Sequence, residues 1–121
     1  MPTFSEKSKA KLETCEQPLQ DLFTEVIKHV DCTVLDGHRN EERQNKAFSE
    51  GNSKAKFPQS KHNAYPSYAV DVIPYPVDWE DIKRFHEFAG IVQGIASQMN
   101  IKIKWGGHFS WFDGPHYQLE K

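Results

Sequence analysis

Two histidines and two carboxylates have the residue types and the order of a catalytic metal site. Asp113 and His116 lie in the segment Asp113-Gly-Pro-His116, and His62 and Asp71 precede them in the chain. A hydrolytic zinc ion takes three protein ligands and leaves its fourth position to water, while a nearby carboxylate accepts the proton of that water. The pattern therefore predicts His62, Asp71 and His116 as metal ligands and Asp113 as the base.

Each of these residues also has a simpler interpretation. In a chain with 6 histidines and 17 acidic residues, an acid three positions before a histidine arises by chance. Asp71 needs a partner if it is buried on a strand, but an ordinary salt bridge would suffice. His62 could be an exposed loop histidine, whereas Pro115 fixes the backbone before His116. The neighbouring segments must therefore supply the specificity.

Arg39 follows Gly37 at the expected end of a strand, where a side chain can project into a cleft. A guanidinium held there could bind a substrate carboxylate or stabilise a developing oxyanion. The alternative is a surface ion pair with Glu41, Glu42 or another acid.

The other histidines are weaker candidates. His108 follows Gly106-Gly107 in the loop before Asp113, so it could line the same cleft. His38 is next to Arg39 but would point to the opposite face of a strand, and His29 and His86 are expected to be structural or solvated.

Length and composition exclude several classes of protein. The 121 residues suffice for one apolar core, to which three Trp, eight Phe and four Tyr contribute bulky side chains. The formal net charge is -2 and the basic residues form no uninterrupted block, which argues against a nucleic-acid-binding protein. No segment approaches the roughly 18 apolar residues of a membrane span, and the N-terminus lacks a secretory signal. We expect synthesis in the cytoplasm, with Cys15 and Cys32 as buried free thiols.

Hydrophobic periodicity predicts an α+β fold in which helices pack on a small, largely antiparallel sheet. The N-terminal region, about residues 5–30, is expected to be helical with a break near Pro18, and Thr14 resembles the start of a capping box for a second helix. An ordered loop, long enough to serve as a lid, is expected at 51–67.

A second helical pattern should begin with Asp78 as its cap and run for about twenty residues. Trp79, Ile82 and Met99 are expected on its core-facing stripe. The other expected elements are a helix at 41–50 and strands at 32–36, 68–73, 101–105 and 115–119.

Four segments together carry a family resemblance, which spans roughly residues 34–119. They are Asp36-Gly-His-Arg-Asn-Glu-Glu-Arg-Gln44, Ser60-Lys-His-Asn63 followed by Ala69-Val-Asp-Val72, Trp105-Gly-Gly107, and Asp113-Gly-Pro-His-Tyr-Gln118. In this order they resemble the zinc peptidases that include D-alanyl-D-alanine carboxypeptidases and the L-alanyl-D-glutamate endopeptidases used as phage endolysins. Their joint occurrence is far more specific than any one of them.

The resemblance implies roles for individual residues. His62, Asp71 and His116 would bind Zn²⁺, Asp113 would be the catalytic carboxylate, and Arg39 would stabilise substrate or the tetrahedral intermediate. The expected substrate-binding residues are Ser60, Gln44, His108 and Trp105. The implied fold is the small α+β fold shared with Hedgehog signalling domains.

Two departures from the commoner family pattern affect the expected pocket. The stretch between His62 and Asp71 is longer and contains Tyr65-Pro-Ser67, as in a phage-type branch of the family. The position after Trp105-Gly-Gly is often acidic in relatives, but here it is His108. Both changes lie where they would alter substrate binding.

The sequence thus predicts a single zinc peptidase domain over residues 1–121, with catalytic motifs at 36–119. Its expected substrate is the peptidoglycan stem peptide, and its expected role is that of a monomeric phage endolysin that waits in the host cytoplasm until the membrane is permeabilised. One alternative is a D-alanyl-D-alanine carboxypeptidase, against which the missing signal peptide argues. The other is a non-catalytic zinc-stabilised module that binds the cell wall, although a structural zinc site usually has four protein ligands.

Overall fold

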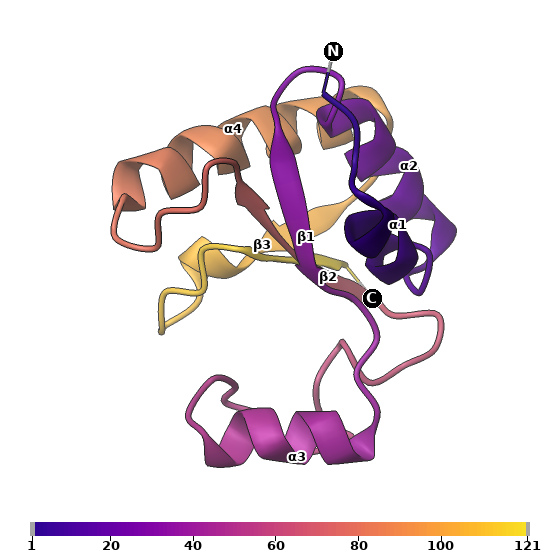
Figure 1. Ribbon diagram of the computed structural model, residues 1–121, viewed down its shortest axis with the longest axis vertical. Helices are drawn as coiled ribbons and strands as arrows, with labels where there is room; N and C mark the ends of the chain where they lie inside the picture. Colours follow the sequence, from indigo (N-terminus) through magenta and orange to yellow (C-terminus); the bar gives the residue numbers. More distant parts are fainter. Residues whose placement is uncertain (1, 121) are drawn as a thin grey trace.

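The computed structural model describes residues 2–120; Met1 and Lys121, both inside the predicted domain, lie outside the described residues. A four-stranded antiparallel sheet has the order β1-β2-β4-β3. Its strands are β1 (Cys32–Asp36), β2 (Ala69–Pro74), β3 (Ile103–Trp105) and β4 (His116–Leu119). The helices are α1 (Glu6–Leu12), α2 (Gln17–Val26), α3 (Glu41–Ser49) and α4 (Ile82–Gln98), with a 3-10 turn η1 (Gly106–His108). The predicted α+β class is confirmed (Figure 1).

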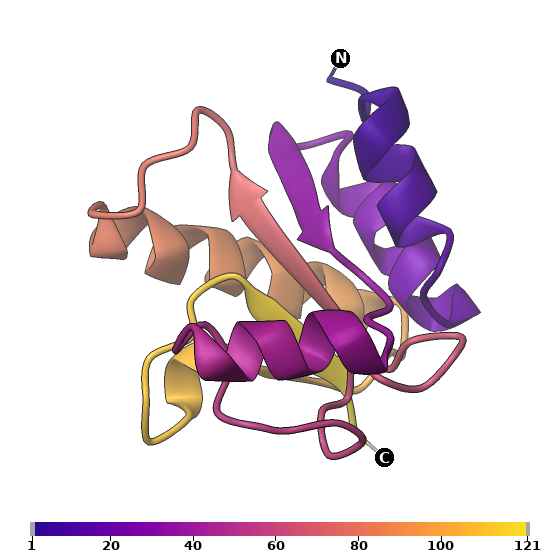
Figure 2. The same cartoon turned by 60° about the horizontal axis from the view of Figure 1, so that its bottom comes forward.

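The helices divide between the two sides of the sheet. α4 contacts β2, β3 and α2, while α1 packs beside β1. Figure 2 shows α3 in front of the sheet and α4 behind it. None of the helices within residues 2–120 combines the length and apolarity that crossing a membrane requires.

The core lies where α2 and α4 pack together and against the sheet. Tyr117 of β4 is fully buried there, and its ring meets Phe23 of α2 edge-on with centroids 5.5 Å apart. Phe88 of α4 packs on the same ring from a centroid distance of 6.3 Å. Because Tyr117 is the immediate neighbour of His116, this packing fixes the strand that carries the predicted ligand. Cys15 and Cys32 are buried and unpaired, as predicted.

The N-terminal helical region breaks where Pro18 predicted, with α1 ending at Leu12 and α2 starting at Gln17. Pro18 occupies the first turn of α2, where its missing N–H costs nothing. The predicted capping role of Thr14 is wrong. Its hydroxyl donates instead to the carbonyl oxygen of Lys11 at 2.6 Å, so it serves the end of the preceding helix.

The start of α4 differs from the prediction. Asp81, not Asp78, is the N-cap, and its carboxylate accepts from the backbone N–H of Arg84 at 3.2 Å. Asp78 accepts from the N–H of Glu80 and so stabilises a turn before the helix. Trp79 is consequently outside the helix and 55% exposed. Ile82 and Met99, expected on the buried stripe, are also exposed.

The end of α4 explains why β3 starts later than predicted. Asn100 has a positive φ of 58°, and the N–H of Ile101 donates to the carbonyl oxygen of Ala96 at 2.9 Å. This is the pattern of a Schellman cap, which uses Ile101 to close the helix. The strand therefore begins at Ile103. The other predicted strands and α3 match the structure within one residue. The segment 51–67 contains turns and bends and ends in an isolated bridge between Ser67 and Cys15.

Candidate metal centre

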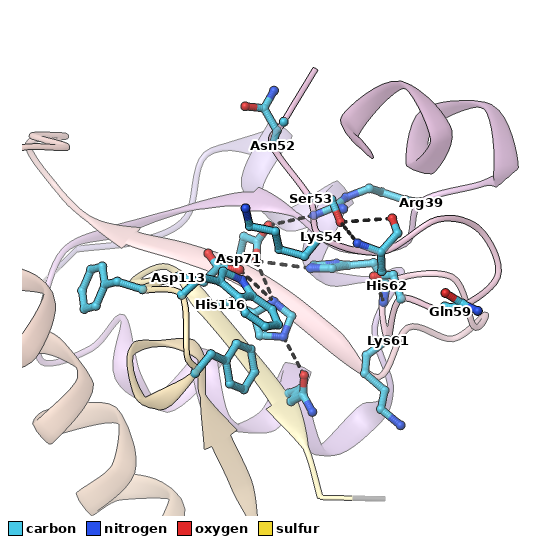
Figure 3. A pocket seen from close by; sticks show the side chains of 17 residues that line it. Arg39, Asn52, Ser53, Lys54, Gln59, Lys61, His62, Asp71, Asp113 and His116 are labelled. Atoms are coloured by element: carbon cyan, nitrogen blue, oxygen red, sulfur yellow. Dashed lines mark hydrogen bonds and ion pairs between the residues drawn. The ribbon is translucent and has the colours of Figure 1, made fainter. Parts of the chain in front are cut away.

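Three side chains that the sequence predicts as ligands lie together beside the sheet. Asp71 and His116 are directly paired residues of β2 and β4, and His62 comes from the loop before β2. Oδ1 of Asp71 lies 3.2 Å from Nε2 of His62 and 3.3 Å from Nδ1 of His116. The candidate ligand atoms all lie within 4.8 Å of one another (Figure 3).

In each histidine one ring nitrogen makes a hydrogen bond outside the group, which determines the nitrogen that faces Asp71. Nδ1 of His62 lies 2.7 Å from the carbonyl oxygen of Gly37, which can only accept, so the proton is on Nδ1. A neutral His62 therefore presents a lone pair at Nε2. Nε2 of His116 lies 2.8 Å from Oε1 of Gln118, which leaves Nδ1 of His116 facing Asp71 in the same way.

The group has the properties expected of a cation site. Among the described residues, Nε2 of His62 and Oδ1 of Asp71 are buried without a hydrogen-bond partner. A nitrogen lone pair and a carboxylate oxygen that face each other repel unless a proton or a cation lies between them. Two imidazole nitrogens and a carboxylate oxygen are ordinary metal ligands, so this group can bind a metal ion.

The electrostatic interactions within this group also favour a bound cation. Burial alone would raise the pKa of Asp71, but His62 and His116 outweigh burial and hold that pKa well below its ordinary value. Burial alone would lower the pKa of His116, yet the hydrogen bond and charge of Asp71 raise it. A proton on His116 then takes the place that a cation would occupy.

Asp113 lies next to the group without joining it. Its Oδ2 is 3.9 Å from Nδ1 of His116, and its side chain is 38% exposed. Burial, followed by the negative charge of Asp71, raises the pKa of Asp113. A carboxylate with a raised pKa is a stronger base, which suits it to accept a proton beside a metal.

Gly106 explains why a glycine follows Trp105 in the third motif. A Cβ at this position would overlap the carbonyl oxygen of Asp113 and the Cβ of His116. Its carbonyl oxygen also accepts from the N–H of Asp113 at 3.1 Å. The close approach of these two backbones positions Asp113 over the ligands.

Arg39 points into the site, but its guanidinium is already engaged. Nε donates to Asp36 at 2.7 Å, Nη1 to Gln44 at 3.0 Å and Nη2 to Oδ2 of Asp71 at 3.1 Å. The ion pairs are therefore with Asp36 and Asp71, and not with Glu41 or Glu42. This arrangement orients the Asp71 carboxylate so that Oδ1 faces the histidines.

The four predicted substrate-binding residues occupy different surroundings. Ser60 lines the pocket, and its hydroxyl accepts from the N–H of His62 at 3.1 Å. Gln44 is fully buried in a hydrogen-bond network. Trp105 is buried and donates from its indole to the carbonyl oxygen of Gly114 at 2.7 Å. His108 is exposed, and its ring packs edge-on against Trp105.

The remaining histidines stay outside the metal group, as predicted. Nδ1 of His38 lies 2.9 Å from the carbonyl oxygen of Ala64. His86 packs against Trp105, and His29 pairs with Glu25.

The metal group opens into a pocket of about 600 Å³. Residues 51–55 and 59–61 form one wall, and Phe109, Trp111 and Phe112 contribute aromatic surface to the other. A second hollow of about 620 Å³ passes between α3 and Trp79 and shares Arg39, Asp71 and Asp113 with the first. The two hollows together form a cleft on either side of the candidate metal centre, where an extended substrate could bind.

The fold and the site together define a hydrolase: an open His-Asp-His group faces a pocket with a free carboxylate beside it. The profile of the phage L-alanyl-D-glutamate peptidase family matches residues 2–121, so the chain belongs to this family of peptidases that act on peptidoglycan. It is similar to the L-Ala D-Glu endopeptidase ChiX of Serratia marcescens, with a TM-score of 0.82 and 27% sequence identity over 98% of this chain and 91% of that chain. A comparison with curated proteins gives no match.

Proposed function

We propose that the protein is a zinc-dependent endopeptidase that hydrolyses the L-alanyl-D-glutamate bond of the peptidoglycan stem peptide. The observation that carries the proposal is the convergence of His62, Asp71 and His116 beside Asp113 at the pocket of a family member. The solved relative ChiX is itself an L-Ala D-Glu endopeptidase with the same fold.

The donor set favours zinc as the metal. Two histidine nitrogens and one carboxylate oxygen form a typical catalytic zinc ligand set, in which the protein leaves one position open. A zinc ion held there would lower the pKa of a coordinated water and polarise the scissile carbonyl.

Asp113 is the proton carrier of the proposed reaction. Its carboxylate takes the proton from the attacking water and then delivers it to the nitrogen of the leaving D-glutamyl residue. The raised pKa of Asp113 helps both steps, because a stronger base becomes a usable acid once protonated.

The other predicted site residues support this centre. Arg39 holds Asp71, Ser60 holds the backbone of His62, and Trp105 holds the loop that ends at His116. We therefore assign Arg39 a positioning role together with its charge, which lies close enough to the pocket to stabilise an oxyanion. His108 would meet substrate only at the outer edge of the site.

Release of new amino groups from purified murein tests the proposal. The zinc-loaded protein should release them, a chelator should stop the release, and added zinc should restore it. Asp113→Asn should lower kcat roughly 100-fold or more, and His116→Ala should abolish metal binding. His29→Ala is a matched control, because His29 is a solvated histidine outside the pocket.

The outcome that would overturn the mechanism is full activity in Asp113→Asn or in the metal-free protein. Mass spectrometry of the products identifies the bond: a new N-terminal D-glutamyl residue supports the endopeptidase, whereas loss of a single alanine supports a D-alanyl-D-alanine carboxypeptidase. Tight murein binding with no cleavage would support a non-catalytic module.

We further propose that residues 1–121 act as one monomeric catalytic domain of a phage endolysin, which reaches the cell wall from the host cytoplasm after the membrane is permeabilised. Within residues 2–120, helices α1, α2 and α4 and all four strands contribute buried residues to one core cluster. Light scattering coupled to size-exclusion chromatography tests the monomer, and a dimer mass would contradict it.

A further inference from the structure

Three cationic side chains line the pocket, and two of them have no charged partner among the described residues. Arg39, Lys54 and Lys61 all line it. Arg39 is engaged by Asp36, Gln44 and Asp71. Within residues 2–120, neither lysine side chain has an ion pair or a hydrogen bond. A lysine whose charge faces a pocket without a partner is available to an anionic ligand.

The two lysines differ in direction. In Figure 3 the side chain of Lys54 extends across the pocket toward Asp113 and the metal ligands, whereas that of Lys61 points away from them. Lys54 is thus an exposed cation, without a partner in the described part of the chain, on the side of the pocket that faces the metal ligands.

The backbone that carries Lys54 is fixed from both sides. Nε2 of Gln44 donates to the hydroxyl of Ser53 at 2.9 Å and to the carbonyl oxygen of Ala55 at 2.7 Å. The N–H of Ala55 also donates to the Ser53 hydroxyl at 3.2 Å. Gln44 is itself fully buried and bonded to Arg39, so the lysine projects from a segment tied to the metal centre. Such preorganisation lowers the entropy lost on binding.

The chemistry of the bond supplies the anion. A D-glutamyl residue has two carboxyl groups, and the peptide can continue through only one of them. The other stays free on the residue whose nitrogen belongs to the scissile amide. Its negative charge would lie near Asp113 and Asp71, so a neighbouring cation is needed to offset the repulsion.

We infer that Lys54 is the specificity-determining residue that binds the free carboxylate of the D-glutamyl residue, an inference that rests on the proposed endopeptidase function. The ammonium group holds this carboxylate on the leaving-group side of the scissile bond. The site then favours stem peptides with a free carboxylate over those in which the same group is an amide.

Paired substrates test this inference. One is a muropeptide with an L-alanyl-D-glutamyl bond and a free α-carboxylate, and the other carries the α-amide. In the zinc-loaded protein, kcat/KM should favour the acidic substrate. Lys54→Met should lower the acidic-to-amidated ratio by roughly 10-fold, mainly through KM, because a charge-assisted hydrogen bond is lost. Lys54→Arg should keep most of the preference.

Two other lysines provide matched controls. Lys56→Met removes the same charge from the same loop, at a residue that does not line the pocket and lies over the Phe48 ring. It should leave the ratio unchanged. Lys61→Met removes the other lysine of the pocket and should change the ratio by less than about 2-fold, because surface charge at a distance is screened.

The outcomes separate the inference from the proposed function. If both substrates are cleaved and Lys54→Met slows them equally, Lys54 does not bind the carboxylate, while the endopeptidase function stands. A ratio that falls in Lys61→Met and not in Lys54→Met also overturns the inference. If the zinc-loaded wild type cleaves neither substrate, the proposed function fails and the inference falls with it.

Discussion

Gln44→Met should destabilise the protein and lower its activity together, because Gln44 connects the metal centre to the pocket loop. Its Oε1 accepts from Arg39 at 3.0 Å and from Asn63 at 3.1 Å, and its Nε2 donates to Ser53 and Ala55. The Gln44 side chain is fully buried, although its hydrogen-bond partners are only partly buried. Methionine has nearly the same size and can make none of these hydrogen bonds.

The expected loss of stability in Gln44→Met follows from the hydrogen-bond partners of Gln44. A hydrogen bond to a charged donor contributes about 2 kcal/mol and a neutral one about 1 kcal/mol. Ser53 and Ala55 are partly exposed and can bond to water instead, whereas the Arg39 nitrogen is largely buried. The free energy of unfolding should therefore fall by about 3 to 5 kcal/mol, which lowers Tm by roughly 15 °C for a domain of this size.

Urea unfolding of the metal-free variant measures this loss, and kcat/KM on murein measures the loss of activity. Gln59→Met is the matched control, because Gln59 lies in the exposed part of the same loop and should change stability by less than about 0.5 kcal/mol. Gln44→Glu keeps the acceptor for Arg39 and removes the donors to the loop, so it should affect activity more than stability. A Gln44→Met protein as stable as Gln59→Met would refute the proposed network.

Three further predictions concern the backbone, the thiols and pH. Gly106→Ala should lower kcat/KM by at least about 10-fold with an unchanged circular dichroism spectrum, because its methyl would overlap the Cβ of His116; normal activity would contradict this. Burial raises the pKa of Cys15 and of Cys32 to about 12, so a thiol reagent at neutral pH should label neither before unfolding and both after it. The lowered pKa of Asp71 contributes stability that is lost as pH falls through its folded value, and the raised pKa of His116 contributes stability that is lost as pH rises through its folded value. The urea midpoint of the metal-free protein should therefore peak between these two pKa values, and Asp71→Asn should flatten the profile.

The sequence predicted the parts of the fold that depend on local patterns. The break at Pro18, the helix at 41–50 and the strands at 32–36, 68–73 and 115–119 all depend on short stretches of sequence, and the structure confirms them within one residue. The choice between Asp78 and Asp81 as the α4 cap could not be made in this way. Both aspartates accept a backbone N–H bond from two or three residues further on, so the local sequence does not distinguish the turn at Asp78 from the helix start at Asp81.

The candidate site shows the same division. The order of the motifs predicted that His62, Asp71 and His116 form one group, and the structure places their ligand atoms close enough together to bind one ion. The saturated bonding of Arg39 and Gln44 could not be predicted, because it joins α3, β2 and the pocket loop through contacts distant in sequence. Lys54 was missed for a related reason. A lysine in a polar loop has no sequence signal, and its direction follows from the anchoring of its two neighbours.

Asp71 and His116 are partners in the ladder between β2 and β4. Side chains alternate between the faces of a sheet, so a slip of one residue would carry one ligand to the opposite face. A metal ion that binds both residues therefore favours one alignment of these strands over every shifted alignment while the chain folds. In this sense the ion would serve as a template for strand pairing before it serves in catalysis. His62 lies on a loop, so it can bind the ion after the two strand residues and dissociate from it before them.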